Sequence, residues 1–216
     1  TPDLQAVLDF FLLAGDDIYD DLIGTSVVRL YERLNHWLKS NWKFQARKNI
    51  SYHYDLGNQF YREWLDKTMT YSSAIFKNKK EVLSTAQTNK YESICKNLNL
   101  KEGDSVLEIG CGWGGFAEHA IKTRGVKLTG LTLSKEQLDY SKKRMFELGM
   151  ADKSSFLLQD YRDEKGVYDG VVSIEMFEAV GEKYWPIYFK TIKNSLKSGG
   201  LGLSLIHISE PTRLRR

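Results

Sequence analysis

The 216-residue sequence predicts an α/β fold in which a parallel sheet is covered by helices on both faces. From Lys101 onward, short apolar segments alternate with segments of helical periodicity, and this rhythm is typical of parallel strands joined by crossover helices. One apolar segment runs directly into a glycine-rich loop, residues 110–115, and then into a helix. Because such sheets bind ligands at the carboxyl ends of their strands, we expect the functional residues to follow the strands directly.

The elements can be assigned in chain order. Residues 1–48 carry apolar and aromatic residues at helical spacing, and residues 49–98 are rich in Tyr, Asn and His before they become helical. Residues 84–87 and 134–137 each fit a capping box, and the first is expected to open a helix that ends near Leu98. The remaining expected strands are 105–109, 126–131, 156–158, 168–174 and one from 201, and the expected helices are 114–122, 134–148 and 184–196, the last ended by the glycines at 199–200.

Composition excludes several classes of protein. Apolar residues make up 42% and charged residues 27% of the chain, which is globular composition. The net charge of +3 falls to about +1 without residues 205–216, which carry three Arg against one Glu, so no nucleic-acid footprint is present. No apolar run reaches the ~20 residues of a spanning helix. Two cysteines give no disulfide framework, which favours a reducing cytoplasm.

The glycine loop favours a cationic cofactor over a dinucleotide. Gly110, Gly112 and Gly115 match the dinucleotide pattern G-x-G-x-x-G. A dinucleotide site also needs a carboxylate about 20 residues further on, and residues 131–134 contain none. Glu108 lies instead in the strand that leads into the loop, where a carboxylate suits the ammonium and sulfonium of S-adenosylmethionine. The alternative is that Glu108 only pairs with a neighbouring lysine.

Seven segments carry a resemblance to a known family. They are 49–58 (NISYHYDLGN), 60–61 (FY), 65–66 (LD), 69–73 (MTYSS), 108–115 (EIGCGWGG), 130–134 (GLTLS) and 173–181 (SIEMFEAVG). In this order they resemble the cyclopropane fatty acid synthases, which include the mycolic acid cyclopropane synthases, over residues 46–203. The resemblance implies the class I methyltransferase fold, Rossmann-like, with S-adenosylmethionine as cofactor.

The resemblance also implies roles for individual residues. Those expected to bind the cofactor are Tyr71 and Ser72 (methionine part), Glu108, Gly110, Gly112 and Gly114 (central loop), Thr132, Leu133 and Gln137 (ribose and adenosine) and Tyr161 (adenine). Those expected at the reacting centre are Glu178 and the backbone near Ser73, which would hold a bicarbonate ion as the base; no metal is expected. Rival interpretations remain open: Gln137 could cap its helix, Tyr161 could be a surface aromatic, and Phe60, Tyr61 and Trp64 could line an acyl groove or form core.

The implied reaction is methylene transfer from S-adenosylmethionine to the cis double bond of an unsaturated phospholipid acyl chain, which forms a cyclopropane ring. The partner would be lipid at a membrane surface, with a cytoplasmic, peripheral location, no nucleic acid and an undetermined oligomeric state. The rival hypotheses are methylation of a fatty acyl chain or a small amine by a related enzyme, and a cofactor-binding module without catalysis.

The sequence departs from the family pattern in three places. Ser73 and Ala179 stand where the best-known members have Cys and His. The last segment, 204–216, matches nothing expected there and is interpreted as a non-family tail, so the chain is expected to be a fragment without strands six and seven. The expected division is 1–48 (helical), 49–98 (covering the acyl and cofactor sites), 99–203 (cofactor-binding) and the tail.

Overall fold

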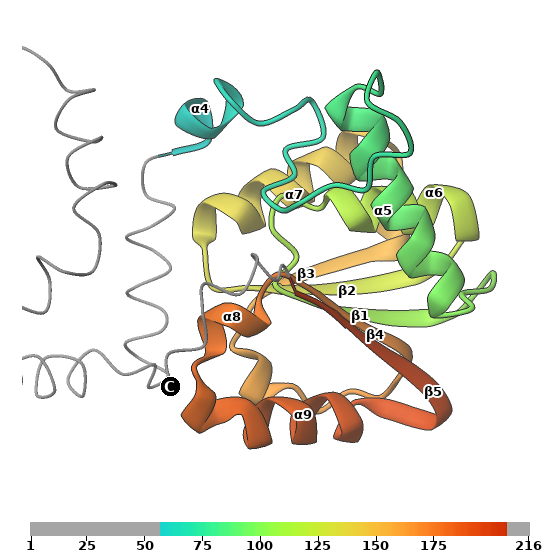
Figure 1. Cartoon of the computed structure of the whole chain (residues 1–216). Helices are drawn as coiled ribbons and strands as arrows, with labels where there is room; N and C mark the ends of the chain where they lie inside the picture. Colours follow the sequence, from blue (N-terminus) through green and yellow to red (C-terminus); the bar gives the residue numbers. More distant parts are fainter. Residues whose placement is uncertain (1–56, 207–216) are drawn as a thin grey trace, which may run out of the picture. The chain divides into compact units, whose positions relative to one another are not determined.

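A computed structural model describes residues 57–206, and these form an α/β structure around one five-stranded parallel sheet (Figure 1). The expected helices of residues 1–48, most of the 49–58 motif and the end of the tail lie outside the described residues. The strands are β1 Ser105–Ile109, β2 Lys127–Thr132, β3 Ser154–Leu158, β4 Tyr168–Ile174 and β5 Leu196–Leu205, in the spatial order β3-β2-β1-β4-β5. The strand order reverses between β1 and β4, which is the position where sheets of this kind bind ligands. The parallel sheet predicted from the sequence is confirmed.

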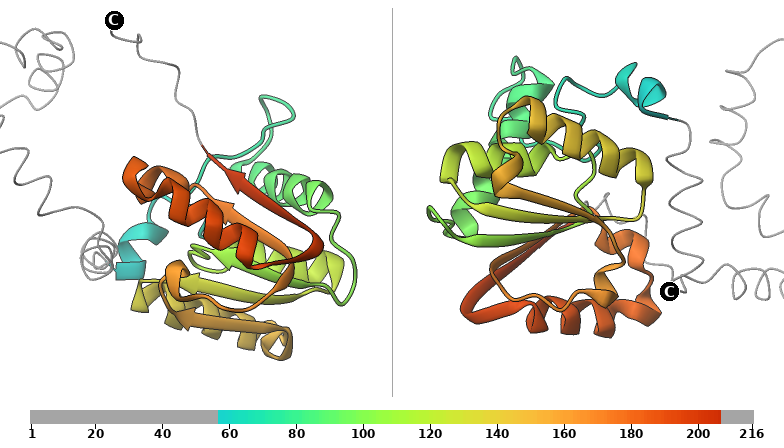
Figure 2. Two further views of the ribbon diagram at one scale, coloured as in Figure 1. Left: turned by 90° about the horizontal axis from the view of Figure 1, so that it is seen from below. Right: turned by 180° about the vertical axis from the view of Figure 1, so that it is seen from behind.

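Helices cover both faces of this sheet. They are α4 Gly57–Arg62, α5 Leu83–Asn97, α6 Gly115–Arg124, α7 Lys135–Glu147, α8 Phe177–Val180 and α9 Trp185–Asn194, with short 3-10 turns at Ala151–Lys153, Tyr161–Asp163 and Glu182–Tyr184. In Figure 1 the helices α5, α6 and α7 lie on one face and α8 and α9 on the other, and the view from behind in Figure 2 agrees.

The central strand β1 shows why both faces are covered. Successive side chains of a strand point to opposite faces. Val106 packs into a core with residues of α5 and α6, whereas Leu107 packs with Tyr188 and Ile192 of α9. A strand that is apolar on both faces requires a helix on each side, and the crossover helices supply them.

Two helix starts differ in how they are capped. The capping box predicted at residues 84–87 is wrong: α5 begins at Leu83, and its N-cap Val82 makes no side-chain hydrogen bond. The Gln87 amide donates instead to the carbonyl of Ser72 at 2.7 Å, so it cannot reach back to the helix start. At α7 half of the expected box is present, since the Ser134 hydroxyl accepts the Gln137 backbone N–H at 3.3 Å.

The fifth strand begins earlier than predicted. The sequence predicts a helix to residue 196 and a strand from 201, but α9 ends at Asn194 and β5 begins at Leu196. Leu196 pairs with Tyr168, and the next pair is Leu201 with Gly170, so the register shifts between them. Gly199, with φ of +80°, lies in this irregularity. The glycine pair therefore forms a bulge inside the strand rather than the end of the helix.

We expect Gly130→Ala to destabilise the fold. A Cβ at Gly130 of β2 would lie 2.7 Å from a ring carbon of Phe156 and 2.9 Å from the Cβ of Cys111, and both of those residues are buried. Overpacking of this kind lowers the free energy of unfolding by about 1–3 kcal/mol. Urea denaturation measures the loss, with Ser155→Ala on the exposed part of β3 as the control. Equal stability of the two variants would show that the sheet relaxes freely at this position.

Candidate functional site

The glycine loop lies at the carboxyl end of β1 and is bonded to the neighbouring strand. The carbonyl of Leu131 accepts the backbone N–H groups of both Gly110 and Cys111, at 3.0 and 2.9 Å. Gly110, Gly112 and Gly114 have φ of +80°, +52° and +79°, which is the left-handed region that favours glycine. The loop then enters α6, and the first N–H groups of a helix have no partner within the helix.

Glu108 is the unusual group beneath this loop. Its side chain is only 2% exposed, and its Oε2 has no hydrogen-bond partner among the described residues. Burial raises the pKa of this carboxyl well above its ordinary value, and the charges of Lys90 and Arg144 oppose that rise only in part. Glu108 forms no ion pair with a lysine of the described residues, whose lysine ion pairs all involve other acids. The structure therefore does not support the interpretation that Glu108 merely pairs with a neighbour. A buried, unpartnered carboxyl fits a cationic hydrogen-bond donor.

A turn formed by Ser72 and Ser73 is attached to the inner side of α5. The buried ammonium of Lys90 contacts the Ser72 hydroxyl and donates to the Ser73 carbonyl at 2.7 Å, and Gln87 donates to the Ser72 carbonyl. Burial lowers the pKa of Lys90 to about 8, although Glu175, Asp66 and Glu108 act in the opposite direction. The helix α5 therefore holds the turn through the ammonium of Lys90 and the side-chain amide of Gln87.

The same turn is bonded to the end of β4. Glu175 directly follows this strand, and its Oε1 accepts the Ser73 N–H at 2.9 Å and also the Ser73 hydroxyl. Glu175 has φ of +48°, an unfavourable conformation for a residue with a long side chain. The next residue, Met176, lies against the glycine loop, 3.1 Å from the position that a Cβ on Gly110 would take. The turn, the β4 end and the glycine loop therefore form one site.

Neither Lys90 nor Glu175 was identified from the sequence. Lys90 lies in a helix beside the apolar positions Tyr91 and Ile94, so a lysine at a core-facing position was the available signal. Glu175 immediately follows a strand, where functional residues were expected, but the resemblance directed attention to Glu178. In the structure Glu178 lies in α8 with an exposed side chain.

The residues expected to contact the ribose and adenosine are close together. The Thr132 hydroxyl donates to the Gln137 side-chain carbonyl at 2.8 Å, and both residues are buried. The Ser134 N–H donates to Thr132 rather than to Gln137, so Gln137 does not complete a capping box. Leu133 lies between them and is half-buried.

The two expected aromatic contacts lie in different surroundings. Tyr161 lies in the 3-10 turn after β3 and packs on Tyr188, with ring centres 5.7 Å apart. Tyr161 is partly buried, and this burial raises its pKa to about 12. Tyr71 is nearly half exposed and lies 5.2 Å from Trp64, ring centre to ring centre. Tyr61 is buried against Trp113.

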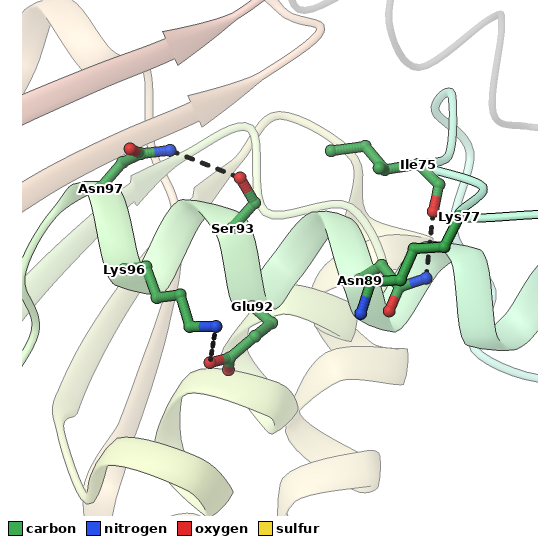
Figure 3. A pocket seen from close by; sticks show the side chains of 7 residues that line it. All are labelled: Ile75, Lys77, Asn89, Glu92, Ser93, Lys96 and Asn97. Atoms are coloured by element: carbon green, nitrogen blue, oxygen red, sulfur yellow. Dashed lines mark hydrogen bonds and ion pairs between the residues drawn. The ribbon is translucent and has the colours of Figure 1, made fainter.

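A surface hollow on α5 is separate from this site. It is lined by Ile75, Lys77, Asn89, Glu92, Ser93, Lys96 and Asn97 (Figure 3), and none of them is a predicted site residue. Within residues 57–206, no group of three or more His, Cys, Asp and Glu could hold a metal ion. The described helices also include none that is long and apolar enough to cross a membrane.

Comparisons with known proteins identify the family of this chain. The sequence profile of the mycolic acid cyclopropane synthetase family matches residues 42–213. The matched range includes most of the 204–216 segment that was interpreted as a non-family tail, and that interpretation stays a prediction.

Among curated proteins, the chain is 41% identical over 176 residues to a "probable fatty acid methyltransferase" of Pseudomonas putida, a match that covers 79% of this chain and 45% of that protein. It is 42% identical to the cyclopropane-fatty-acyl-phospholipid synthase of Escherichia coli K12, with 70% of this chain and 38% of the relative covered. The chain therefore spans less than half the length of these curated relatives.

A solved structure of mycolic acid cyclopropane synthase CmaA1, complexed with SAH and CTAB, superposes with a TM-score of 0.71 and 32% identity. The superposition covers 73% of this chain and 55% of the other. The fold of the described residues is thus the class I methyltransferase fold that was predicted.

We expect Lys90→Met to remove a pH dependence of stability. The folded-state pKa of Lys90 is about 8 and the ordinary value is 10.5, so the unfolded chain binds more protons between these pH values. The free energy of unfolding should therefore rise through this window, by at most about 1.4 kcal/mol per pH unit from this group. Urea denaturation from pH ~8 to ~9.5 measures the slope.

The control for this prediction is Lys143→Met, because Lys143 is exposed on α7. It should keep the slope of the unchanged chain. An equal slope in the Lys90→Met variant would contradict the lowered pKa.

Proposed function

Because the chain belongs to the mycolic acid cyclopropane synthetase family, we propose that it is part of an enzyme that transfers a one-carbon unit from S-adenosylmethionine to a lipid acyl chain. The observation that carries the proposal is the buried Glu108 carboxyl under a glycine loop at the β1–β4 reversal point, whose Oε2 has no hydrogen-bond partner among the described residues. A phosphate would be repelled by this carboxyl, whereas an ammonium group would satisfy it.

The residues present fit S-adenosylmethionine, which would supply an electrophilic methyl group. Glu108 would accept a hydrogen bond from the cofactor's ammonium, beneath the loop of Gly110, Gly112 and Gly114. Tyr71 and Ser72 would cover the methionine part, Thr132, Leu133 and Gln137 would contact the ribose and adenosine, and Tyr161 would lie near the adenine. The SAH in the CmaA1 structure supports this choice of cofactor.

An exposed aromatic cluster offers a surface for the acyl chain. Phe60, Trp64 and Tyr71 are each nearly half exposed, and the ring centres of Phe60 and Trp64 lie 6.2 Å apart. Aromatic faces both bury a hydrocarbon chain and stabilise a cation that forms on it. The matched Escherichia coli protein is named for a phospholipid acyl substrate. We infer that the acceptor is the cis double bond of an unsaturated phospholipid chain at a membrane surface and that the product carries a cyclopropane ring.

Ring closure needs a base that removes a proton from the transferred carbon. We propose that bicarbonate acts as this base and that Glu178 holds it, together with the backbone near Ser73. In the structure the Ser73 N–H is bonded to Glu175, so an anion at this position would have to share or replace that contact.

A second candidate is methylation of a fatty acyl chain without ring closure. The 41% identity to the Pseudomonas putida protein favours it. Both reactions use the same cofactor site, and they differ only in which carbon loses a proton after the transfer.

We expect Glu108→Gln to weaken cofactor binding and to stabilise the free chain. The substitution removes a charge-assisted hydrogen bond, so the affinity for S-adenosylmethionine should fall roughly 10- to 100-fold. In the unliganded fold the pKa of Glu108 is raised, so its ionised form lowers stability at neutral pH, and the neutral amide should relieve this. Calorimetry measures the first effect and urea denaturation the second. A variant that is more stable and binds as tightly as the unchanged chain would contradict the cofactor site.

The reaction itself can be tested with methyl-deuterated methionine fed to cells that express the chain and contain unsaturated phospholipids. Mass spectrometry should show acyl chains that gain one carbon. The added carbon should keep two deuterons if it loses one, as ring closure requires. It should keep three if the proton is lost from a carbon of the acyl chain. The Glu108→Gln variant is the control. Unmodified lipids from a chain that binds S-adenosylmethionine would contradict acyl transfer.

A further inference from the structure

Large apolar side chains are exposed in the loop between the Ser72–Ser73 turn and α5 and at the first residue of α5. Ile75, Phe76 and Val82 of the loop and Leu83 of the helix are between 41% and 64% exposed, and they lie within nine residues of sequence. Scattered exposed apolar residues are ordinary on a protein surface, but four within one short segment indicate a contact surface. In the left view of Figure 2 this loop protrudes from the body of the protein.

Hydrogen bonds within the loop give it a defined turn. The Glu81 carboxylate accepts the Lys77 backbone N–H at 2.7 Å, and the Glu81 N–H donates to the Asn78 carbonyl at 3.3 Å. These bonds bring residues 77 and 81 together, so Phe76 and Val82 stand on either side of the turn.

The tip of this turn is basic. Lys77, Lys79 and Lys80 are exposed, and none of them forms an ion pair with a described residue. The nearby acid is Glu81, whose contact with the Lys77 N–H holds its pKa below the ordinary value, so the loop carries a net charge of about +2 at neutral pH. A basic tip flanked by apolar side chains is complementary to a surface with anionic headgroups above hydrocarbon.

The loop and the candidate site are attached to the same helix. One residue separates Ser73 from Ile75, whose N–H donates to the Ala86 carbonyl at 3.2 Å and whose carbonyl accepts the Asn89 amide at 3.1 Å. Figure 3 shows Ile75 and Lys77 beside Asn89 of α5. A surface that docks on this loop would therefore lie next to the turn bonded to Glu175.

We propose that residues 75–83 form the membrane-docking loop of this protein, in which Phe76 and Val82 enter the interface of an anionic lipid bilayer and the three lysines contact its headgroups. This inference rests on the proposed lipid substrate. It specifies the surface through which that substrate would be approached.

Vesicle cosedimentation tests the proposal with the full chain. Vesicles of phosphatidylcholine alone are compared with vesicles that contain equal parts of phosphatidylcholine and phosphatidylglycerol. We expect binding to the anionic vesicles only, and loss of most of it in ~1 M salt. The combined variant Lys77→Gln, Lys79→Gln, Lys80→Gln should bind roughly 100-fold more weakly, and Phe76→Ser combined with Val82→Ser should also weaken binding roughly 10-fold or more.

Matched controls separate the loop from general charge and hydrophobicity. Lys142→Gln, Lys143→Gln, Lys153→Gln removes three exposed lysines elsewhere, and Phe146→Ser removes a 76% exposed aromatic from α7. Both should bind vesicles as the unchanged chain does. Phe189→Ser tests the exposed aromatic of α9, which lies beside Lys190. An effect of any control as large as that of the loop variants would overturn the proposal, as would equal binding to both vesicle types.

Calorimetry with S-adenosylmethionine distinguishes this proposal from the proposed function. The loop variants should keep the affinity of the unchanged chain for the cofactor, which also shows that they are folded. A chain that binds the cofactor but no anionic vesicle would overturn the docking loop and leave the cofactor site intact. Loss of cofactor binding in the loop variants would also overturn it, because the loop would then be part of the site's structure.

Discussion

The buried carboxyl of Glu108, which has no hydrogen-bond partner among the described residues, is the constraint to which the surrounding structure is adapted. Two cations lie close enough to affect its pKa, yet each is held by other partners. Arg144 is bonded to Glu118 and to the carbonyls of Thr68 and Trp113, and Lys90 is bonded to the Ser72–Ser73 turn. These two cations therefore limit the rise in the pKa of Glu108 but form no hydrogen bond with it. The carboxyl can still accept hydrogen bonds from a ligand.

The segment that carries Tyr71, Ser72 and Ser73 is anchored from below by a chain of hydroxyl groups. Thr68 contacts Thr70 at 2.6 Å, and Thr70 contacts the buried Tyr91 hydroxyl at 2.6 Å. Burial raises the pKa of Tyr91, so this phenol stays neutral and remains able to donate. Tyr91 of α5 and Arg144 of α7 thus hold this loop, which has no regular structure of its own, against the strand ends. Preorganisation of this kind reduces the entropy lost when a ligand binds.

Much of the sheet could be predicted from the sequence because its strands are short apolar runs with clear boundaries. The fourth strand, residues 168–174, has the bounds that were predicted. The start of β5 could not be predicted, because a glycine pair after a helix is equally typical of a helix end and of a strand bulge. Glu108 was identified because its position in a strand before a glycine loop restricts what it can contact. Lys90 and Glu175 were missed because their roles depend on Ser72 and Ser73, far away in the sequence, and no local pattern records that proximity.

The backbone of Glu175 has a consequence for what a substitution there would measure. A residue with a side chain in the left-handed region stores about 1–2 kcal/mol of strain relative to the right-handed one. Glu175 is held there from two sides, because its backbone N–H donates to the Leu205 carbonyl at 2.8 Å and its side chain accepts the Ser73 N–H. Replacement of Glu175 by glycine would therefore remove the strain and the contact with Ser73 together, and the resulting change in stability is the difference between the two.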